Sequence, residues 1–187
     1  TWKYYGDEEE PKLHTGWFEA VPSKELNSDD HENGTTHWYY ANSKGEITIP
    51  TADGEVGVVK TIDGKSYLFN SDGEMVTGLR ILTYDGSKIT NISSEVDSAD
   101  TVKNMNSDTM KLVYFESNGA AKTGTTTITL DGTSYTFSFK SNGSPRGVGE
   151  TGISDGYIYQ NGLRLTADED TKYGVVTYKN ESYVVNE

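Results

Sequence analysis

The chain of 187 residues contains no cysteine, only four prolines and no apolar run long enough to cross a bilayer. Without cysteine it has neither a disulfide framework nor a thiolate metal site. It is also lean in leucine, isoleucine and valine, because only 33% of its residues are hydrophobic and many of these are aromatic. These absences exclude a disulfide-rich domain and predict no membrane insertion.

Positive charge is scarce as well, with 16 Lys and Arg against 29 Asp and Glu and a net charge of -13. Phosphate backbones need clustered cations, and the chain has no basic patch, so a nucleic-acid partner is excluded. It also lacks a serine nucleophile elbow, a phosphate-binding loop and a dinucleotide fingerprint. We therefore expect a protein that is not an enzyme and that needs no cofactor.

Histidine gives little support for a metal site. His14, His31 and His37 are the only histidines, and none of them stands beside a second ligand at metal-binding spacing. Acidic residues lie near His31, but a solvated polar loop is the better explanation. The acidic run 168–170 lacks the alternating ligands of a calcium loop. The sequence predicts no metal.

What the chain does contain is aromatic residues and glycine: 13 Tyr, 5 Phe, 3 Trp and 20 Gly. Aromatic residues favour pleated strands and glycine supplies tight turns, so the composition predicts an all-β protein. One phrase recurs, in which an aromatic strand is followed by Asn or Ser, a turn Gly and a small apolar strand. Its copies lie at 66–78 and 113–124, with weaker copies at 39–45, 137–143 and 157–162.

Each copy reads as a β-hairpin with one half-buried face. In 134–139 the aromatic residues alternate with hydroxyl residues, which places them on opposite faces of a strand. One hairpin cannot bury its aromatic face alone, so we predict a solenoid of stacked hairpins. We expect a single repeat domain with approximate units 1–34, 35–60, 61–91, 111–128, 129–150 and 151–187.

Polar, acidic stretches interrupt this rhythm and are predicted to be inserted loops. They are 7–10 together with 23–34, and 92–110. In the last of these we expect one short helix near 94–105. Ser93 or Ser94 is its expected N-cap, with Glu95 and Asp97 in the first turn.

The repeats resemble the cell-wall-binding repeat family, which includes choline-binding modules, glucan-binding repeats and the repeats of large clostridial toxins. The resemblance covers nearly the whole chain. It rests on Trp2-Lys3-Tyr4-Tyr5 followed by Thr15-Gly16-Trp17, on Trp38-Tyr39-Tyr40 followed by Gly45, and on the phrases 67–78 and 114–124. It implies a hairpin solenoid that binds choline or saccharide between successive units.

The aromatic residues of this pattern are the candidate ligand-binding residues, and they compete with a purely structural role in the core. They are Trp2, Tyr5, Trp17, Trp38, Tyr40, Tyr67 and Tyr114. A choline cage pairs a Gly-Trp with a Trp-Tyr-Tyr, and only Trp17 and Trp38 fit those places. Later units hold Leu79, Thr125 and Ile153 instead of the first tryptophan, so saccharide is the more plausible ligand.

The sequence thus predicts a non-catalytic module that anchors a secreted bacterial protein to a cell-wall polymer or surface glycan. We expect the chain to be a segment of a longer exported protein on the cell surface or in the wall. The alternative is a structural spacer or protein-interaction array whose aromatic residues only pack. Half-exposed Trp17 and Trp38 around one concavity would favour binding, and sealed ones would favour the spacer.

Overall fold

The computed structural model describes residues 1–6, 11–143, 146–167 and 170–186. The predicted loop 7–10 and most of the acidic run 168–170 therefore lie outside the described residues. The strands are β1 (Gly16–Ala20), β2 (His37–Ala41), β3 (Gly57–Ile62), β4 (Lys65–Asn70), β5 (Gly78–Asp85), β6 (Lys88–Ile92), β7 (Met110–Phe115), β8 (Gly124–Leu130), β9 (Thr133–Phe139), β10 (Gly152–Ser154), β11 (Tyr157–Gln160), β12 (Leu163–Arg164), β13 (Tyr173–Tyr178) and β14 (Glu181–Asn186), and the helices are α1 (Ser28–Asn33) and α2 (Ala99–Lys103).

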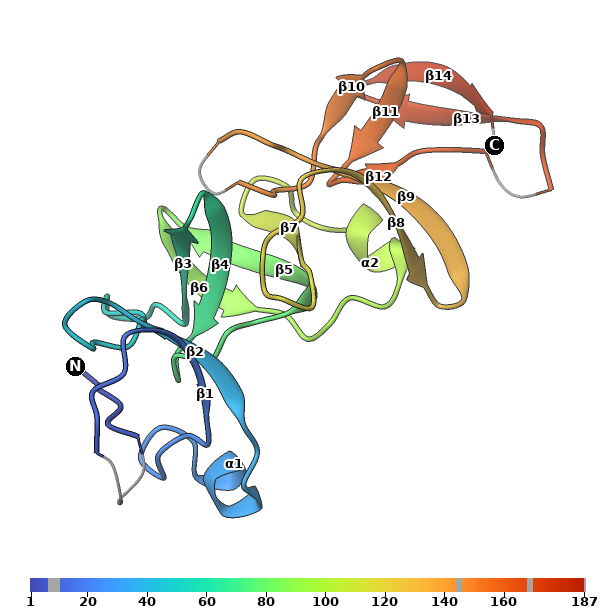
Figure 1. Cartoon of the computed structure of the whole chain (residues 1–187). Helices are drawn as coiled ribbons and strands as arrows, with labels where there is room; N and C mark the ends of the chain where they lie inside the picture. Colours follow the sequence, from blue (N-terminus) through green and yellow to red (C-terminus); the bar gives the residue numbers. More distant parts are fainter. Residues whose placement is uncertain (7–10, 144–145, 168–169, 187) are drawn as a thin grey trace.

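The strands of the described residues form four antiparallel sheets that follow one another along the chain. Their orders are β1-β2, β4-β3-β6-β5-β7, β10-β11-β12-β9-β8 and β13-β14. Figure 1 shows them as an elongated array running from the N-terminal to the C-terminal end. The chain is an all-β solenoid of stacked hairpins, as predicted. No helix in the described part is long and apolar enough to span a membrane.

A network around an asparagine closes the turn after each of two aromatic strands. The Asn42 side-chain oxygen accepts hydrogen bonds from the backbone N–H of Lys44 (2.8 Å) and Glu46 (3.0 Å), and its amide donates to the Glu46 carboxylate (2.8 Å). Asn70 does the same with Asp72 and Glu74. Such side-chain acceptors replace the backbone partners that a tight turn leaves free. The predicted Asn–Gly turn signals therefore have a direct structural cause.

Hydrogen bonds between successive units hold the solenoid together. Met75 lies opposite Phe69 in its own hairpin, at a position whose N–H points outward. That N–H donates to the carbonyl of Trp38 in the preceding unit (2.8 Å). The same bond recurs from Ile47 to Trp2 (2.9 Å), from Ala121 to Ser66 (2.8 Å) and from Gly149 to Leu112 (2.8 Å). We call these four bonds the inter-unit bonds.

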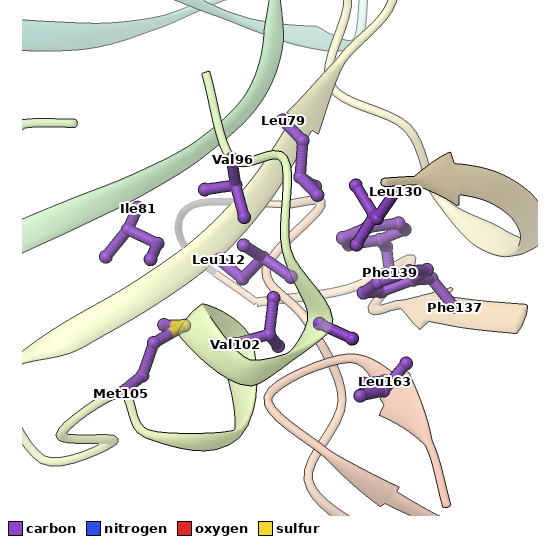
Figure 2. Packing of buried hydrophobic residues seen from close by; sticks show 11 residues of the cluster. Leu79, Ile81, Val96, Val102, Met105, Leu112, Leu130, Phe137, Phe139 and Leu163 are labelled. Atoms are coloured by element: carbon purple, nitrogen blue, oxygen red, sulfur yellow. The ribbon is translucent and has the colours of Figure 1, made fainter. Parts of the chain in front are cut away.

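Three clusters of buried side chains follow the same path. Figure 2 shows the largest, in which helix α2 packs Val102 near Leu112. Its buried members are Leu79, Ile81, Val96, Ala99, Val102, Met105, Leu112, Leu130, Phe137, Phe139 and Leu163. The second consists of Leu68, Leu82, Ile89, Val113 and Phe115, and the third of Phe18, Ala20, Tyr39 and Ala41. Small separate clusters are what stacked hairpins produce, because each unit packs only against its neighbours.

The predicted helix near 94–105 is present as α2, but its cap differs from the expected one. Ser98 is the N-cap and accepts from the N–H of Asp100 (3.2 Å), which is the acidic residue of the first turn. Ser93 cannot cap, because its hydroxyl oxygen accepts from the N–H of Ile81 (2.9 Å) and donates to the carbonyl of Ser94. The helix covers the core with Ala99 and Val102.

The stretch 23–34, predicted as an inserted loop, contains the short helix α1. Asn27 caps it by accepting from the N–H of Asp30 (3.1 Å), and Gly34 ends it with a φ of 68°. No residue of α1 is buried, so the stretch carries no apolar periodicity that would indicate a helix. Asn27 therefore caps a helix, whereas Asn42 and Asn70 close hairpin turns.

The turn network predicts the effect of Asn42→Ala. The substitution removes two hydrogen bonds to backbone N–H groups, so the free energy of unfolding should fall by about 1–3 kcal/mol in urea denaturation. Ser43→Ala, at the exposed next position, should change it by less than about 0.5 kcal/mol. Equal effects of the two substitutions would show that the asparagine does not hold the turn.

Candidate functional site

The β1–β2 hairpin sorts its side chains onto two faces. Trp17 lies opposite Tyr40 in the register, and Glu19 lies opposite Trp38. Directly opposed residues of an antiparallel pair share a face, and successive residues alternate between faces. The second face carries Phe18, which is buried. The first, which we call the aromatic face, consists of Trp17, Glu19, Trp38 and Tyr40.

Trp17 is the centre of a ring cluster that joins two units. Its ring centroid lies 5.1 Å from that of Tyr40 and 4.8 Å from that of Tyr67, with interplanar angles of 67° and 63°. The ring of Phe69 lies 5.8 Å away and is fully buried. Edge-to-face pairs of this kind each contribute about 0.5–1.5 kcal/mol beyond area burial. Trp17, Tyr40 and Tyr67 remain partly exposed, so the cluster is fixed by packing yet open to solvent.

A lysine adds a positive charge to this cluster. The Lys60 ammonium lies over the Tyr40 ring, 5.6 Å from its centroid. Lys60 is placed there because it pairs with Tyr67 across the β3–β4 hairpin. A cation over a tyrosine face is attracted by the ring's electrons. The position next to Tyr40 therefore already has a cationic neighbour within the protein.

Trp38 and Glu19 form the open end of the aromatic face. Trp38 is 46% exposed, which is unusual for the largest apolar side chain. The Glu19 carboxylate opposite it is exposed and accepts a hydrogen bond from the Thr36 hydroxyl (2.7 Å). The aromatic face thus combines exposed ring surface with hydrogen-bonding groups at its edge.

The other candidate residues lie elsewhere. Tyr114 is partly buried and packs against the largest core cluster, 6.4 Å from the Phe139 ring. Trp2 is half-buried, and its carbonyl accepts an inter-unit bond. Tyr5 is 50% exposed. Within the described residues no ring contact joins Trp2 or Tyr5 to the aromatic face, so the structure brings together Trp17, Tyr40 and Tyr67 and places Trp38 beside them.

Sequence reasoning missed Lys60, because nothing in its local pattern indicates that a strand of the next unit will carry it over Tyr40. It also missed a hollow of about 760 Å³ further along the solenoid. The charged groups that line this hollow are Glu55, Asp108, Lys111, Lys140 and Arg146. Its wall includes Tyr84, whose buried hydroxyl has no hydrogen-bond partner among the described residues.

No family model and no curated protein matches this chain. Among solved structures it is similar to CbpJ from Streptococcus pneumoniae TIGR4, at 21% identity over 87% of this chain and 44% of that one, with a TM-score of 0.32. It is similar to choline binding protein F from Streptococcus pneumoniae, in the presence of a peptidoglycan analogue, at 20% identity over 92% and 50% of the chains and a TM-score of 0.26.

A third similar structure is truncated alternansucrase from Leuconostoc mesenteroides, at 17% identity over 96% of this chain and 13% of that one, with a TM-score of 0.32. The chain thus spans about half the length of the two streptococcal structures and a small part of the enzyme.

The unpartnered Tyr84 hydroxyl predicts the effect of Tyr84→Phe. Burial raises the pKa of Tyr84 to about 12. In the unfolded chain the phenol ionises near pH 10, so stability is lost as the pH rises from about 10 to 12. Tyr84→Phe should remove that part of the alkaline loss and raise the free energy of unfolding at pH 7 by about 1 kcal/mol.

Denaturant unfolding at pH 7 and at pH 11 measures both effects. Tyr5→Phe, at a tyrosine that is 50% exposed, is the matched control and should leave both values unchanged. A marked loss of stability of Tyr84→Phe at pH 7 would mean that the hydroxyl has a stabilising partner.

Proposed function

We propose that this chain is a non-catalytic binding module that holds a secreted bacterial protein on a cell-wall polymer or another surface glycan. The observation that carries the proposal is the exposure of Trp38, at 46%, on the same hairpin face as the half-buried Trp17. Neither tryptophan is sealed in the core. A spacer whose rings only pack gives no reason to leave this much indole surface in water.

The aromatic face has the composition that suits a saccharide. A sugar presents an apolar face that stacks on Trp or Tyr, and a rim of hydroxyl groups that needs hydrogen-bonding partners. Trp17, Trp38 and Tyr40 supply the ring surface, and the exposed Glu19 carboxylate lies at its edge. Because Trp17 is held by Tyr40 and Tyr67, its ring is ordered before a ligand arrives, which lowers the entropic cost of binding.

Lys60 favours saccharide over choline as the ligand. A quaternary ammonium group seeks the faces of electron-rich rings, and the Lys60 ammonium already lies over Tyr40 at 5.6 Å. A second cation beside it would meet like-charge repulsion. A neutral sugar meets no such penalty, and the ammonium can donate hydrogen bonds to its hydroxyl groups.

The aromatic face also fits binding better than hydrolysis. Glycoside hydrolysis uses two carboxylates on either side of the scissile bond, and the described aromatic face includes one, Glu19. The net charge of -13 makes an uncharged glycan a more suitable partner than a polyanion.

Titration with purified cell-wall polysaccharide, followed by tryptophan fluorescence, tests the proposal. We expect a saturable change in fluorescence. Trp38→Ala should weaken the affinity for the polysaccharide at least about 10-fold, because a stacking anchor contributes more than about 1 kcal/mol. Trp17→Ala should abolish binding of the polysaccharide. Trp2→Ala, outside the aromatic face, should bind as the unchanged chain does.

Circular dichroism confirms that each variant is folded, and the exposed position of Trp38 makes its variant the safest one to interpret. If the folded, unchanged chain gave no response to polysaccharide, the result would favour the spacer function. A response that survived in Trp17→Ala and Trp38→Ala would place binding away from the aromatic face.

Lys60→Met tests the ligand class. The substitution keeps the apolar stem but removes the charge, so choline should bind the variant about 5-fold more tightly than it binds the unchanged chain. Lys65→Met changes an exposed lysine of the adjacent strand and should leave choline binding as it was. Equal choline binding in all three proteins would remove Lys60 as the reason for a saccharide preference.

A further inference from the structure

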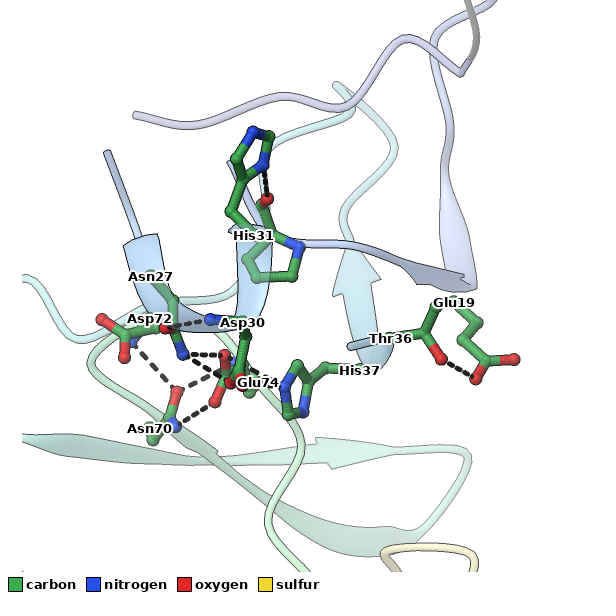
Figure 3. Close-up of polar contacts among 10 residues, drawn as sticks. Glu19, Asn27, Asp30, His31, Thr36, His37, Asn70, Asp72 and Glu74 are labelled. Carbon is green, nitrogen blue, oxygen red and sulfur yellow. Dashed lines mark hydrogen bonds and ion pairs between the residues drawn. The ribbon is translucent and has the colours of Figure 1, made fainter. Parts of the chain in front are cut away.

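Three potential metal ligands from distant parts of the chain meet on the other side of β2 from the aromatic face. They are Asp30 of α1, His37 at the start of β2, and Glu74 in the turn after β4. The His37 Nε2 atom lies 2.9 Å from Asp30 Oδ2 and 3.6 Å from Glu74 Oε1. The three ligand atoms all lie within 4.8 Å of one another. Figure 3 shows the side chains converging.

The cluster carries an excess of negative charge in a partly buried position. Glu74 is buried, with 8% of its surface exposed. Asp72 follows Asn70 in the same turn, and its side chain lies close by (Figure 3). Among the ion pairs of the described residues, those of Asp30 and Glu74 both go to His37. Asp30 and Glu74 therefore share one imidazole while the Asp72 carboxylate lies close by, and an additional cation would relieve the repulsion among the three.

A buried hydroxyl without a partner points to a ligand at the same place. Tyr39 is 2% exposed, and its hydroxyl has no hydrogen-bond partner among the described residues. Its side chain lies on the same face of β2 as His37, since the two positions differ by two. The face of β2 that carries His37 therefore also holds a buried polar group with an unmet hydrogen bond.

We propose that Asp30, His37 and Glu74 bind one divalent transition-metal ion, for which Zn²⁺ is the best-suited probe. One imidazole nitrogen and two carboxylate oxygens are ligands that Zn²⁺ accepts, whereas Ca²⁺ and Mg²⁺ prefer oxygen alone. Bond lengths of about 2.0–2.2 Å place tetrahedral ligands roughly 3.3–3.6 Å apart. The observed separations need only small side-chain movements to reach this arrangement.

Two asparagines already orient the carboxylates. The Asn27 amide donates to Asp30 Oδ2 (2.8 Å) and to Glu74 Oε1 (3.0 Å), and the Asn70 amide donates to Glu74 Oε2 (2.8 Å). Partners of this kind hold ligands in place and commonly affect metal affinity. His37 and Glu74 also line a hollow of about 510 Å³, which provides an entry path.

The metal would act as a staple between units. Asp30 belongs to the 23–34 stretch, which has no buried helical residue to hold it, and Glu74 belongs to the next unit. One ion would bind both to β2 in a chain that has no cysteine for a disulfide. Because an unfolded chain does not assemble such a site, metal binding adds to folding stability.

Isothermal titration of the full, tag-free, metal-free chain with Zn²⁺ tests the proposal. We expect one Zn²⁺ per chain, and a midpoint of thermal unfolding that rises by about 5–10 °C at a Zn²⁺ concentration 100 times the dissociation constant. Ca²⁺ should give neither effect. His37→Gln and Asp30→Asn should each weaken Zn²⁺ binding by more than about 100-fold, because loss of an orienting partner alone costs 10- to 100-fold.

The residues on either side of Asp30 offer matched controls. Asp29→Asn changes an exposed neighbour in α1, and His31→Gln removes a histidine whose Nδ1 lies 2.8 Å from the carbonyl of Pro22. Both should bind Zn²⁺ as the unchanged chain does. If a ligand variant unfolds, the Co²⁺ absorption spectrum of the unchanged chain, with its ligand-field bands from a nitrogen-oxygen site, supplies the readout. Absence of Zn²⁺ binding, or equal loss in ligand and control variants, would overturn the proposal.

Discussion

The structure depends on one constraint: the N–H that follows each hairpin turn points away from its own hairpin and must find a partner in the preceding unit. Met75, Ala121 and Gly149 meet it by donating to the carbonyls of Trp38, Ser66 and Leu112. A two-stranded hairpin is only marginally stable in water, and an unpaired buried N–H would lower its stability further. Each unit therefore completes the one before it, and the chain grows as a solenoid with small, separate cores.

The same constraint limits where a binding face can exist. A residue near the start of each aromatic strand supplies the carbonyl of the inter-unit bond, and it is Trp38 in β2, Ser66 in β4 and Leu112 in β7. Ser66 and Leu112 are buried, as is Leu79, which occupies the place of Trp17 in a later unit. Thr125 and Ile153, at the place of Trp17 in the units beyond, are exposed but carry no ring. The aromatic face is thus confined to the N-terminal part of the solenoid.

The fold was predictable from the sequence because each unit carries its own local signal. The phrase 66–78 contains the aromatic strand, the Asn70 network and the turn Gly73, and each of these acts within a few residues. The site was less predictable, since it depends on contacts between units. Trp17 and Tyr67 meet only after β3 and β4 are stacked on the first hairpin, and His37 meets Glu74 across a turn of the next unit. Neither spacing is periodic, so no local pattern indicates it.

Strand β2 connects the two proposed sites. Trp38 and Tyr40 face one way, and His37 and Tyr39 face the other. The Trp38 carbonyl accepts the N–H of Met75, which follows Glu74 directly. An ion bound by His37 and Glu74 would therefore fix the two backbone segments that this hydrogen bond joins, on the far side of the strand from the glycan. Restricting β2 before a glycan arrives reduces the entropy lost on binding, and by linkage a bound glycan would strengthen metal binding by the same factor. This restriction would matter most for the exposed Trp38 ring, because Tyr67 holds the ring of Trp17 but not that of Trp38.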